Sequence, residues 1–269
     1  MKGIEVKEYQ LLISTLEKDA HSLCEKNNID SDAIVINQND CNFYECFEIN
    51  GYSIEEYGFS QRGIGLSREM ALNLSSAEII QFTDDDVVFI KGYRDIVLSE
   101  MRAHPEADAI IFSDEVSEYV RGDERKIGDI MKKFHRINLY EATYLRFVCG
   151  AIRSEKLRYN NIHYNTLLGT KGKYDSGEDT AFLCDMIRLG LKVYVSPKVI
   201  ANTSFSESTW YEGKNAAYFR ERGSLMAAVF PKNCIAMAFI KAFKNRKVSS
   251  FKEIFNNYLQ GIREYKSHL

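Results

Sequence analysis

Short apolar runs alternate with helical patterns through the first part of the chain, and this rhythm is the strongest constraint on its fold. Each run has four to six residues, too few for a buried helix, and amphipathic segments separate the runs. The predicted strands are Gln10–Ser14, Ala33–Ile36, Glu78–Phe82 and Ala107–Phe112, and the predicted helices are Glu17–Asn28, Ser67–Leu74 and Asp95–Ala103. Elements in this order predict an α/β sandwich around a mostly parallel sheet.

Local signals predict further elements. Asn50-Gly51 is a strong hairpin signal, and Ser67 is the expected N-cap region of its helix. Residues 113–146 are charged and weakly periodic, so they receive no assignment. The other predicted elements are the hairpin strands Cys46–Ile49 and Ser53–Tyr57, the strand Phe147–Ile152, the helix Thr180–Leu189 closed by Gly190, and the short strands Val193–Val195 and Val199–Ala201 around Pro197.

Polar residues follow three of the predicted strands, at Ser14-Thr15, Asn37–Asp40 and Asp84-Asp85-Asp86. Ligands of parallel sheets bind outside the carboxyl ends of the strands, so these residues are candidates for one binding crevice. Three adjacent carboxylates repel one another unless solvent or a cation neutralises them. The triplet therefore predicts a site for Mg²⁺ or Mn²⁺, which favour one or two carboxylates plus substrate phosphates. A solvated acidic turn is the alternative.

Three further positions carry side chains suited to chemistry. Glu178-Asp179 opens a predicted helix after Gly177, so one carboxylate can cap the helix while the other acts as a general base; simple capping is the alternative. Arg68 lies near a predicted helix start and opposes the helix dipole, which fits either an anionic or planar partner or a surface arginine. Trp210 is either a core residue or a platform for sugar stacking.

Charge and composition narrow the function classes. With 35 basic and 38 acidic residues the net charge is −3, which argues against nucleic-acid binding over the whole surface. The six cysteines form no C-x-x-C pair, a distribution typical of cytosolic thiols rather than of a disulfide framework or a zinc site. The chain shows neither a signal-peptide core nor an apolar run of membrane-spanning length, so we expect a cytoplasmic protein.

The charge is divided unevenly along the chain. Residues 231–269 hold eight Lys and Arg against two Glu, a net +6, which leaves −9 on residues 1–230. We therefore expect a body, 1–230, and a basic amphipathic helical tail, 231–269. An apolar stripe at helical spacing runs through Phe251, Ile254, Phe255, Tyr258, Leu259 and Ile262. This helix either docks on its own domain or a second subunit, or contacts an anionic membrane together with Lys241, Lys244, Arg246 and Lys247.

The combination of motifs from about Gln10 to Trp210 resembles family 2 glycosyltransferases with the GT-A fold, a Rossmann-like α/β/α sandwich. The variant looks like the bacterial enzymes that build capsular and other surface polysaccharides. The segments that carry the resemblance are Leu66-Ser67-Arg68, Ile79–Phe82 with Asp84-Asp85-Asp86-Val87, Gly177-Glu178-Asp179, Gly190-Leu191-Lys192-Val193 and Ser208-Thr209-Trp210.

This resemblance implies an inverting, metal-dependent transfer of a sugar from a nucleotide-diphosphate sugar, expected to be a UDP-sugar, to a glycan or lipid-linked glycan. Asp86 would hold Mn²⁺ or Mg²⁺ at the donor diphosphate, and Asp179 would be the base. The expected nucleotide-binding residues are Ser14, Thr15, Asn37, Arg68, Asp84 and Asp85, and the acceptor-side candidates are Glu178 and Trp210. The family usually has Asp where this chain has Asn37, and the proline that usually follows the first strand is missing.

Two alternatives come from other classes. Asp84-x-Asp86-x-Val88 satisfies the D-x-D-x-T/V motif of haloacid-dehalogenase-type phosphatases, although that motif follows the first strand in those proteins and here at least two α/β units precede it. The non-enzymatic alternative is a degenerate glycosyltransferase-like domain that binds a nucleotide sugar or a partner without turnover, and Asn37 favours it.

Overall fold

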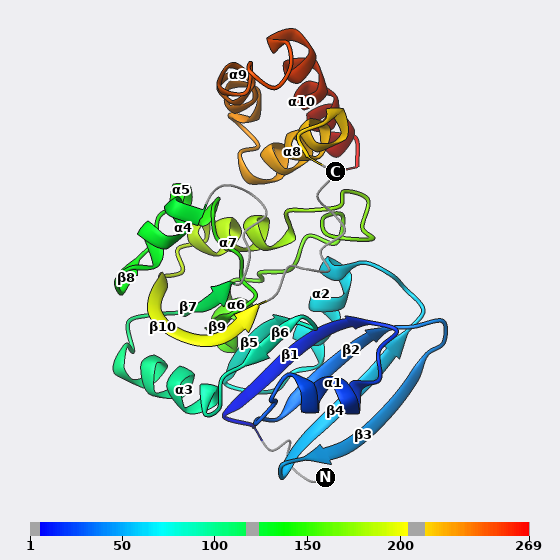
Figure 1. Ribbon diagram of the computed structural model, residues 1–269, viewed down its shortest axis with the longest axis vertical. Coiled ribbons are helices and arrows are strands. Elements are labelled where there is room, and N and C mark those ends of the chain that lie inside the picture. Colours follow the sequence, from blue (N-terminus) through cyan, green and yellow to red (C-terminus); the bar gives the residue numbers. More distant parts are fainter. Residues whose placement is uncertain (1–5, 117–123, 204–212, 269) are drawn as a thin grey trace.

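The computed structural model describes residues 6–116, 124–203 and 213–268 (Figure 1). The strands are β1 (Tyr9–Leu16), β2 (Ala33–Gln38), β3 (Phe43–Ile49), β4 (Tyr52–Phe59), β5 (Ile79–Asp84), β6 (Val87–Phe89), β7 (Ala109–Val116), β8 (His135–Arg136), β9 (Gly150–Arg153) and β10 (Val193–Thr203). The helices are α1 (Ala20–Lys26), α2 (Ile64–Leu74), α3 (Tyr93–Ala103), α4 (Glu124–Met131), α5 (Leu139–Ala142), α6 (Ser154–Tyr159), α7 (Glu178–Arg188), α8 (Ala216–Val229), α9 (Cys234–Lys244) and α10 (Phe251–Lys266).

The strands of the described residues form one sheet in the order β3-β4-β2-β1-β5-β9-β7-β10-β6, with β8 paired to β10 outside this path. The central strands β4, β2, β1 and β5 are parallel to one another, as are β7 and β10. β9 runs antiparallel between β5 and β7, and β3, β6 and β8 pair antiparallel with their neighbours. The predicted α/β architecture with a large, mostly parallel sheet is confirmed.

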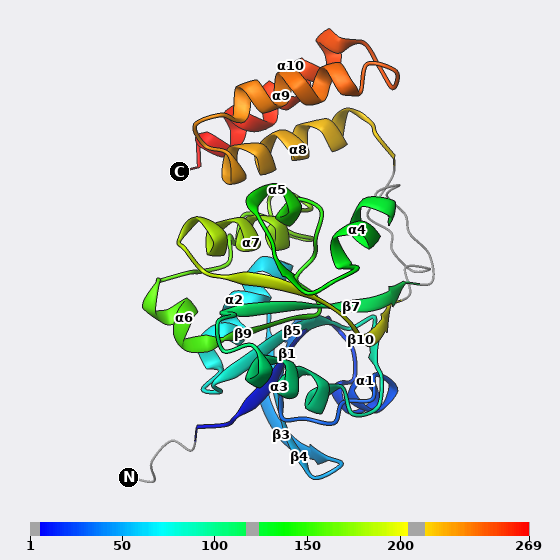
Figure 2. The same cartoon turned by 90° about the vertical axis from the view of Figure 1, so that its left-hand side faces the viewer.

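Both faces of the sheet are buried, because alternate residues of each central strand point to opposite sides. In β1, Leu12 packs in the core that α2 and α7 cover, whereas Leu11 and Ile13 pack in the core that α1 and α3 cover. Figure 2 shows α7 and α3 on opposite sides of the sheet. All six cysteines are free and four are buried, which agrees with their scattered spacing.

The structure corrects the predicted start of two helices. α2 begins at Ile64 with Gly63 as its N-cap, so Ser67 lies inside the helix rather than at its cap. α1 begins at Ala20 because the Asp19 side chain accepts the Ser22 N–H and caps the helix. Between β7 and β9, where the sequence pattern predicts no element, the structure contains α4, β8 and the short helix α5.

A single strand replaces the two predicted around Pro197. β10 runs continuously from Val193 to Thr203, and its pairing with β7 shifts register between Ser196 and Val199 and again before Ala201. Proline has no N–H for the ladder, so a strand that contains it bulges at that point. The Asn50-Gly51 hairpin is confirmed: β3 and β4 pair antiparallel, with Ile49 opposite Tyr52.

The helices α8, α9 and α10 stand together at one end of the molecule, opposite β3 and β4 (Figures 1 and 2). The predicted stripe of α10 faces inward: Ile254, Tyr258 and Ile262 are buried, and Tyr258 packs edge-to-face on Phe219 of α8. The docked position of this helix is therefore the one observed. No helix within the described ranges is long and apolar enough to cross a membrane. The domain boundary at residue 230 stays a prediction.

Glycines allow α8 and α10 to touch through their backbones. A Cβ on Gly261 of α10 would overlap the carbonyl oxygen of Arg220 in α8, and one on Gly223 would overlap the Tyr258 carbonyl oxygen. The Ser224 hydroxyl donates to the Gly261 carbonyl oxygen at 3.1 Å across the same contact. Because the opposing atoms belong to the backbone, they cannot move aside as a side chain would.

We predict that Gly261→Ala lowers the free energy of unfolding by about 1–3 kcal/mol, the range expected for an overpacked interior. Gly128→Ala in α4 is the matched control, since a Cβ there has no atom within 4 Å. That change should stabilise the protein by about 0.5–1 kcal/mol, the usual gain of replacing a helical glycine. Urea unfolding of both variants measures the difference, and a gain at both positions would contradict the close packing.

Candidate active site

The predicted polar strand ends meet at one edge of the sheet. β1 lies between β2 and β5, with Thr15 opposite Asn37 and Ser14 opposite Asp84 in the ladders. Ser14, Thr15 and Asn37 are each at most 3% exposed. The shared direction of the parallel strands thus brings these positions together, as the sequence pattern predicted.

Arg68 connects the acidic motifs. Its guanidinium is 1% exposed, and Nη2 donates to Asp84 Oδ1 at 2.7 Å. Nη1 donates to Asp179 Oδ1 at 2.5 Å and to Glu178 Oε1 at 3.1 Å. The Tyr164 ring centroid lies 5.7 Å from the guanidinium carbon. Arg68 is the fifth residue of α2 and points into the protein, so the surface-arginine alternative and the position at the helix start are both wrong.

Glu178 and Asp179 are the first two residues of α7, and neither takes the N-cap position, which belongs to Gly177. Asp179 instead accepts the Phe147 N–H on Oδ2 at 3.1 Å, while its other oxygen meets Arg68. Burial raises the pKa of both carboxyls, and the Arg68 charge opposes that rise. A carboxylate with a raised pKa is better matched to proton abstraction near neutral pH than an ordinary surface aspartate.

The other two acids of the triplet have different surroundings. Asp85 accepts the Thr15 hydroxyl at 2.7 Å and pairs with Lys18 at 3.1 Å. Asp86 lies exposed in the turn between β5 and β6, and none of the described basic side chains forms an ion pair with it. Partial desolvation by the surrounding protein, followed by the charges of Asp84 and Asp85, raises the pKa of Asp86 to about 6.

Asp86 could supply one carboxylate ligand to a divalent cation. Its carboxylate is a hard oxygen donor close to the negative charges of Asp84 and Asp85, and a cation there would relieve the repulsion. Within the described parts of the chain, no group of three or more His, Cys, Asp or Glu side chains is arranged around a common metal position. The donor set therefore suits a cation that one carboxylate holds and substrate phosphates complete.

Asn37 has an unusual neighbour in Glu56 of β4, which is 6% exposed. The Asn37 amide donates to Glu56 Oε1 and to the Lys18 carbonyl oxygen, both at 2.7 Å. Its own Oδ1 is buried and has no hydrogen-bond partner among the described residues. Burial raises the pKa of Glu56, and the hydrogen bond from Asn37 opposes this. Beside it, the Ser67 hydroxyl donates to Ser14 Oγ at 2.9 Å and holds α2 against β1.

Some residues of the site carried no recognised sequence signal. Asp114, near the end of β7, accepts hydrogen bonds from Arg146 at 2.9 Å and from Thr203 at 2.8 Å. The Arg146 charge lowers the pKa values of Asp86 and Asp179, although burial and neighbouring acids outweigh it. Asp114 follows the apolar run Ala107–Phe112, so the strand-end rule could have found it. Trp210 lies outside the described residues.

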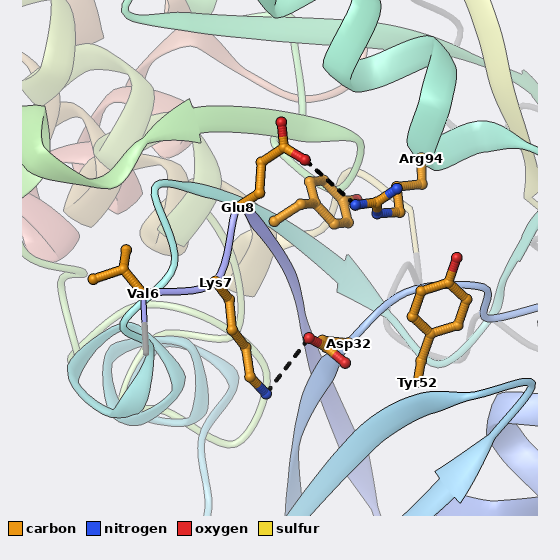
Figure 3. A pocket seen from close by; sticks show the side chains of 7 residues that line it. Val6, Lys7, Glu8, Asp32, Tyr52 and Arg94 are labelled. Atoms are coloured by element: carbon orange, nitrogen blue, oxygen red, sulfur yellow. Dashed lines mark ion pairs between the residues drawn. The ribbon is translucent and has the colours of Figure 1, made fainter. Parts of the chain in front are cut away.

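A separate pocket lies at the opposite, amino ends of the central strands (Figure 3). Its charged side chains already pair with one another, Lys7 with Asp32 at 3.7 Å and Arg94 with Glu8 at 3.5 Å. These pairs leave no excess charge to select an ionic ligand. The carboxyl-end cluster around Arg68 is therefore the candidate active site.

Comparisons with known proteins agree with the topology. No protein-family model matches the sequence, and no curated protein is significantly similar to it. Residues 1–349 of S. aureus TarS, in complex with UDP-GlcNAc, match with 13% identity and a TM-score of 0.61, covering 97% of this chain and 92% of that one. The mannosyltransferase PcManGT from Pyrobaculum calidifontis, in complex with GDP-Man and Mn²⁺, matches with 13% identity and a TM-score of 0.53, covering 97% and 74%. The protein thus has the GT-A glycosyltransferase fold.

We predict that Arg68→Met costs about 3–5 kcal/mol of unfolding free energy at pH 8, because it leaves buried carboxylates without their cation. The pKa values of Glu178 and Asp179, already raised, should rise further, so the folded variant binds protons more tightly than the unfolded chain. Its stability should therefore recover as the pH falls from 8 to 5. Urea unfolding between pH 8 and pH 5 measures this recovery of stability. The measurement remains informative if the variant folds only near pH 5.

Arg62→Gln is the control for this prediction. Arg62 also pairs with two carboxylates, Glu17 at 2.5 Å and Asp40 at 2.8 Å, but at the surface. Replacing Arg62 should lower the free energy of unfolding by about 1 kcal/mol or less. A similar loss in both variants, or no recovery of Arg68→Met at low pH, would show that Arg68 does not hold the carboxylates in place.

Proposed function

We propose that the protein is an inverting glycosyltransferase that moves a hexosyl group from a nucleotide-diphosphate sugar, a UDP-sugar by preference, to a hydroxyl of a glycan or lipid-linked glycan. The observation that carries this proposal is the Arg68 cluster, which joins Asp84, Glu178 and Asp179 at the carboxyl edge of a GT-A sheet. We further propose that it acts in the cytoplasm, at the inner face of the cell membrane, in surface polysaccharide synthesis.

The donor is proposed to lie over the strand ends, with its ribose near Asp84, its base near Asn37 and its diphosphate next to Asp86. Ser14, Thr15 and Asp85 shape this surface: Thr15 fixes the Asp85 carboxylate, and Ser14 fixes α2 through Ser67. Mn²⁺ or Mg²⁺ bound at Asp86 would neutralise charge on the leaving diphosphate. Two of the structural neighbours bound UDP-GlcNAc or GDP-Man, and the second also held Mn²⁺.

Asp179 is proposed as the general base. The acceptor oxygen forms a bond to the anomeric carbon as the bond from that carbon to the phosphate oxygen breaks, and the electron pair leaves with the nucleoside diphosphate. The acceptor proton passes to the Asp179 carboxylate. Attack opposite the leaving group inverts the anomeric carbon, so no covalent sugar–enzyme intermediate is needed. Glu178, beside it on α7, is proposed to face the acceptor, together with Trp210.

The degenerate-domain alternative predicts nucleotide-sugar binding without turnover. Hydrolysis of a UDP-sugar by the protein in the absence of an acceptor separates the two, since only an active site activates water in place of the acceptor. The phosphatase alternative predicts Mg²⁺-dependent turnover of p-nitrophenyl phosphate. Its acidic motif would have to follow the first strand, and here the triplet follows β5.

We predict that Asp179→Asn lowers the transfer or donor-hydrolysis rate by a factor of about 10²–10⁴, the usual contribution of a general base, while UDP affinity changes little. Glu178→Gln is the matched control for donor hydrolysis, a reaction without an acceptor, because it also removes one carboxylate from Arg68 but leaves the proposed base. Steady-state rates and calorimetric UDP affinity are measured for both. If Asp179→Asn keeps wild-type turnover, the assignment of the base is wrong.

We also predict that Asp86→Asn weakens Mn²⁺-dependent UDP binding at least about tenfold, because the cation loses its charged ligand. The same change should raise the unfolding free energy at pH 7.5 by about 1 kcal/mol or less, since it removes like-charge repulsion from a solvent-screened site. Asp86 has a raised pKa of about 6, so the wild type gains stability as the pH falls through 6, and the difference should vanish near pH 4.

Asp95→Asn controls for the loss of one carboxylate, because Asp95 is 85% exposed on α3. It should affect neither UDP binding nor the pH profile. Unaltered Mn²⁺-dependent UDP affinity in Asp86→Asn would remove Asp86 from the proposed metal site, whatever the stability result.

A further inference from the structure

Helix α9 lies at the far end of the molecule, beyond α8 (Figure 2). It presents an apolar face to solvent. Ile235, Phe239, Ile240 and Phe243 are 48–55% exposed, and their spacing of i, i+4, i+5 and i+8 places them on one side of the helix. The opposite side is buried on α8 and α10 through Cys234, Ala238 and Ala242. Val248, in the turn after α9, adds another side chain that is 48% exposed. We call these five exposed side chains the α9 face.

Most charges around the α9 face are positive, and the nearby acid is Glu253 of α10, which accepts a hydrogen bond from the Ser249 hydroxyl next to Val248. Residues 231–250 contain five basic side chains and no acidic one. None of the five forms an ion pair with a carboxylate of the described chain, and the Arg246 guanidinium lies 4.2 Å from the Phe243 ring centroid, against the apolar surface. The basic residues are Lys232, Lys241, Lys244, Arg246 and Lys247.

We propose that the α9 face binds the surface of an anionic lipid bilayer, with its apolar side chains among the headgroups and acyl chains and the basic residues on lipid phosphates. An apolar helix face with a basic border and few acidic residues is the pattern of interfacial helices. This inference names the surface that would hold the protein at the membrane proposed above, and it does not depend on the proposed transfer reaction. It also concerns a surface other than the stripe of α10, whose side chains pack on α8 through Tyr258 and on Phe239 of α9 through Phe251 and Phe255.

A second copy of the chain fits the α9 face less well than a bilayer does. Two α9 faces packed on each other would bring the five positive charges of each copy into one interface, where Glu253 of each copy offsets only part of them. An anionic bilayer matches both the basic residues and the apolar side chains of this surface. It supplies negative charge at its surface and an apolar interior a few ångströms below.

The test measures co-sedimentation of the full chain with vesicles of phosphatidylcholine and phosphatidylglycerol, and with vesicles of phosphatidylcholine alone. We expect binding to the anionic vesicles at low salt and release at high salt. The double variant Ile235→Ser/Ile240→Ser and the triple variant Lys244→Gln/Arg246→Gln/Lys247→Gln should each bind at least about tenfold more weakly. All these side chains are exposed, so thermal unfolding should match the wild type.

Matched controls change the same chemistry elsewhere. Tyr159→Ser/Leu189→Ser removes two exposed apolar side chains, and Lys26→Gln/Lys133→Gln/Lys192→Gln removes three exposed charges. Both should bind vesicles as the wild type does. Wild-type binding by the α9 variants, or no binding by the wild type, would overturn the proposal. So would a lipid-free dimer, seen by light scattering, that Ile235→Ser/Ile240→Ser converts to a monomer. The assay uses no sugar donor, so its outcome is independent of the transfer activity.

Discussion

The buried guanidinium of Arg68 is the interaction on which the candidate active site depends. It joins α2 to the end of β5 and to the start of α7, segments up to 111 residues apart in the chain. Desolvated carboxylates at these positions would be costly without a cation. The approach of α2 is fixed independently, because Gln38 Oε1 accepts the Gly63 N–H at 2.7 Å and Ser67 reaches Ser14. The helix therefore delivers Arg68 to a position that the sheet edge defines.

The sequence predicted β1, β2 and β5 well, because each contains a short apolar run followed by polar residues, and their parallel direction follows from the helices between them. The tendency of ligands to bind at the carboxyl ends of parallel strands located Asp84–Asp86 and Asn37. It could not show that Arg68 is the partner of Asp179, since a contact over 111 residues depends on the whole fold. Nor could the periodicity of α10 tell which surface its stripe would cover, because a membrane and α8 are equally apolar partners.

The acidic side chains of the candidate active site outnumber its basic ones, which leaves the site with a net negative charge. Arg68 is shared by three carboxylates, and Lys18 neutralises only Asp85. The pKa values of Asp86, Glu178 and Asp179 are all raised first by desolvation, which is partial at Asp86, and then by neighbouring acids. Such an arrangement is unfavourable for folding but suits a site that receives a cation at one acid and a proton at another. The surroundings of the two acids match these two roles: Asp86, proposed for the cation, is exposed in a turn, and Asp179, proposed for the proton, is enclosed beside Arg68.

The C-terminal helices connect this site to the proposed membrane surface. Gly177, which precedes Glu178, has a φ of 106°, and a Cβ there would lie 2.7 Å from the Leu225 side chain of α8. The start of α7 is thus shaped by α8, which in turn packs on α10 through Gly223 and Gly261. The α9 face stands on the far side of these helices. A protein held at a bilayer by α9 would therefore keep Glu178 and Asp179 at a fixed distance from the lipid surface, because each contact between them is direct packing of helix on helix.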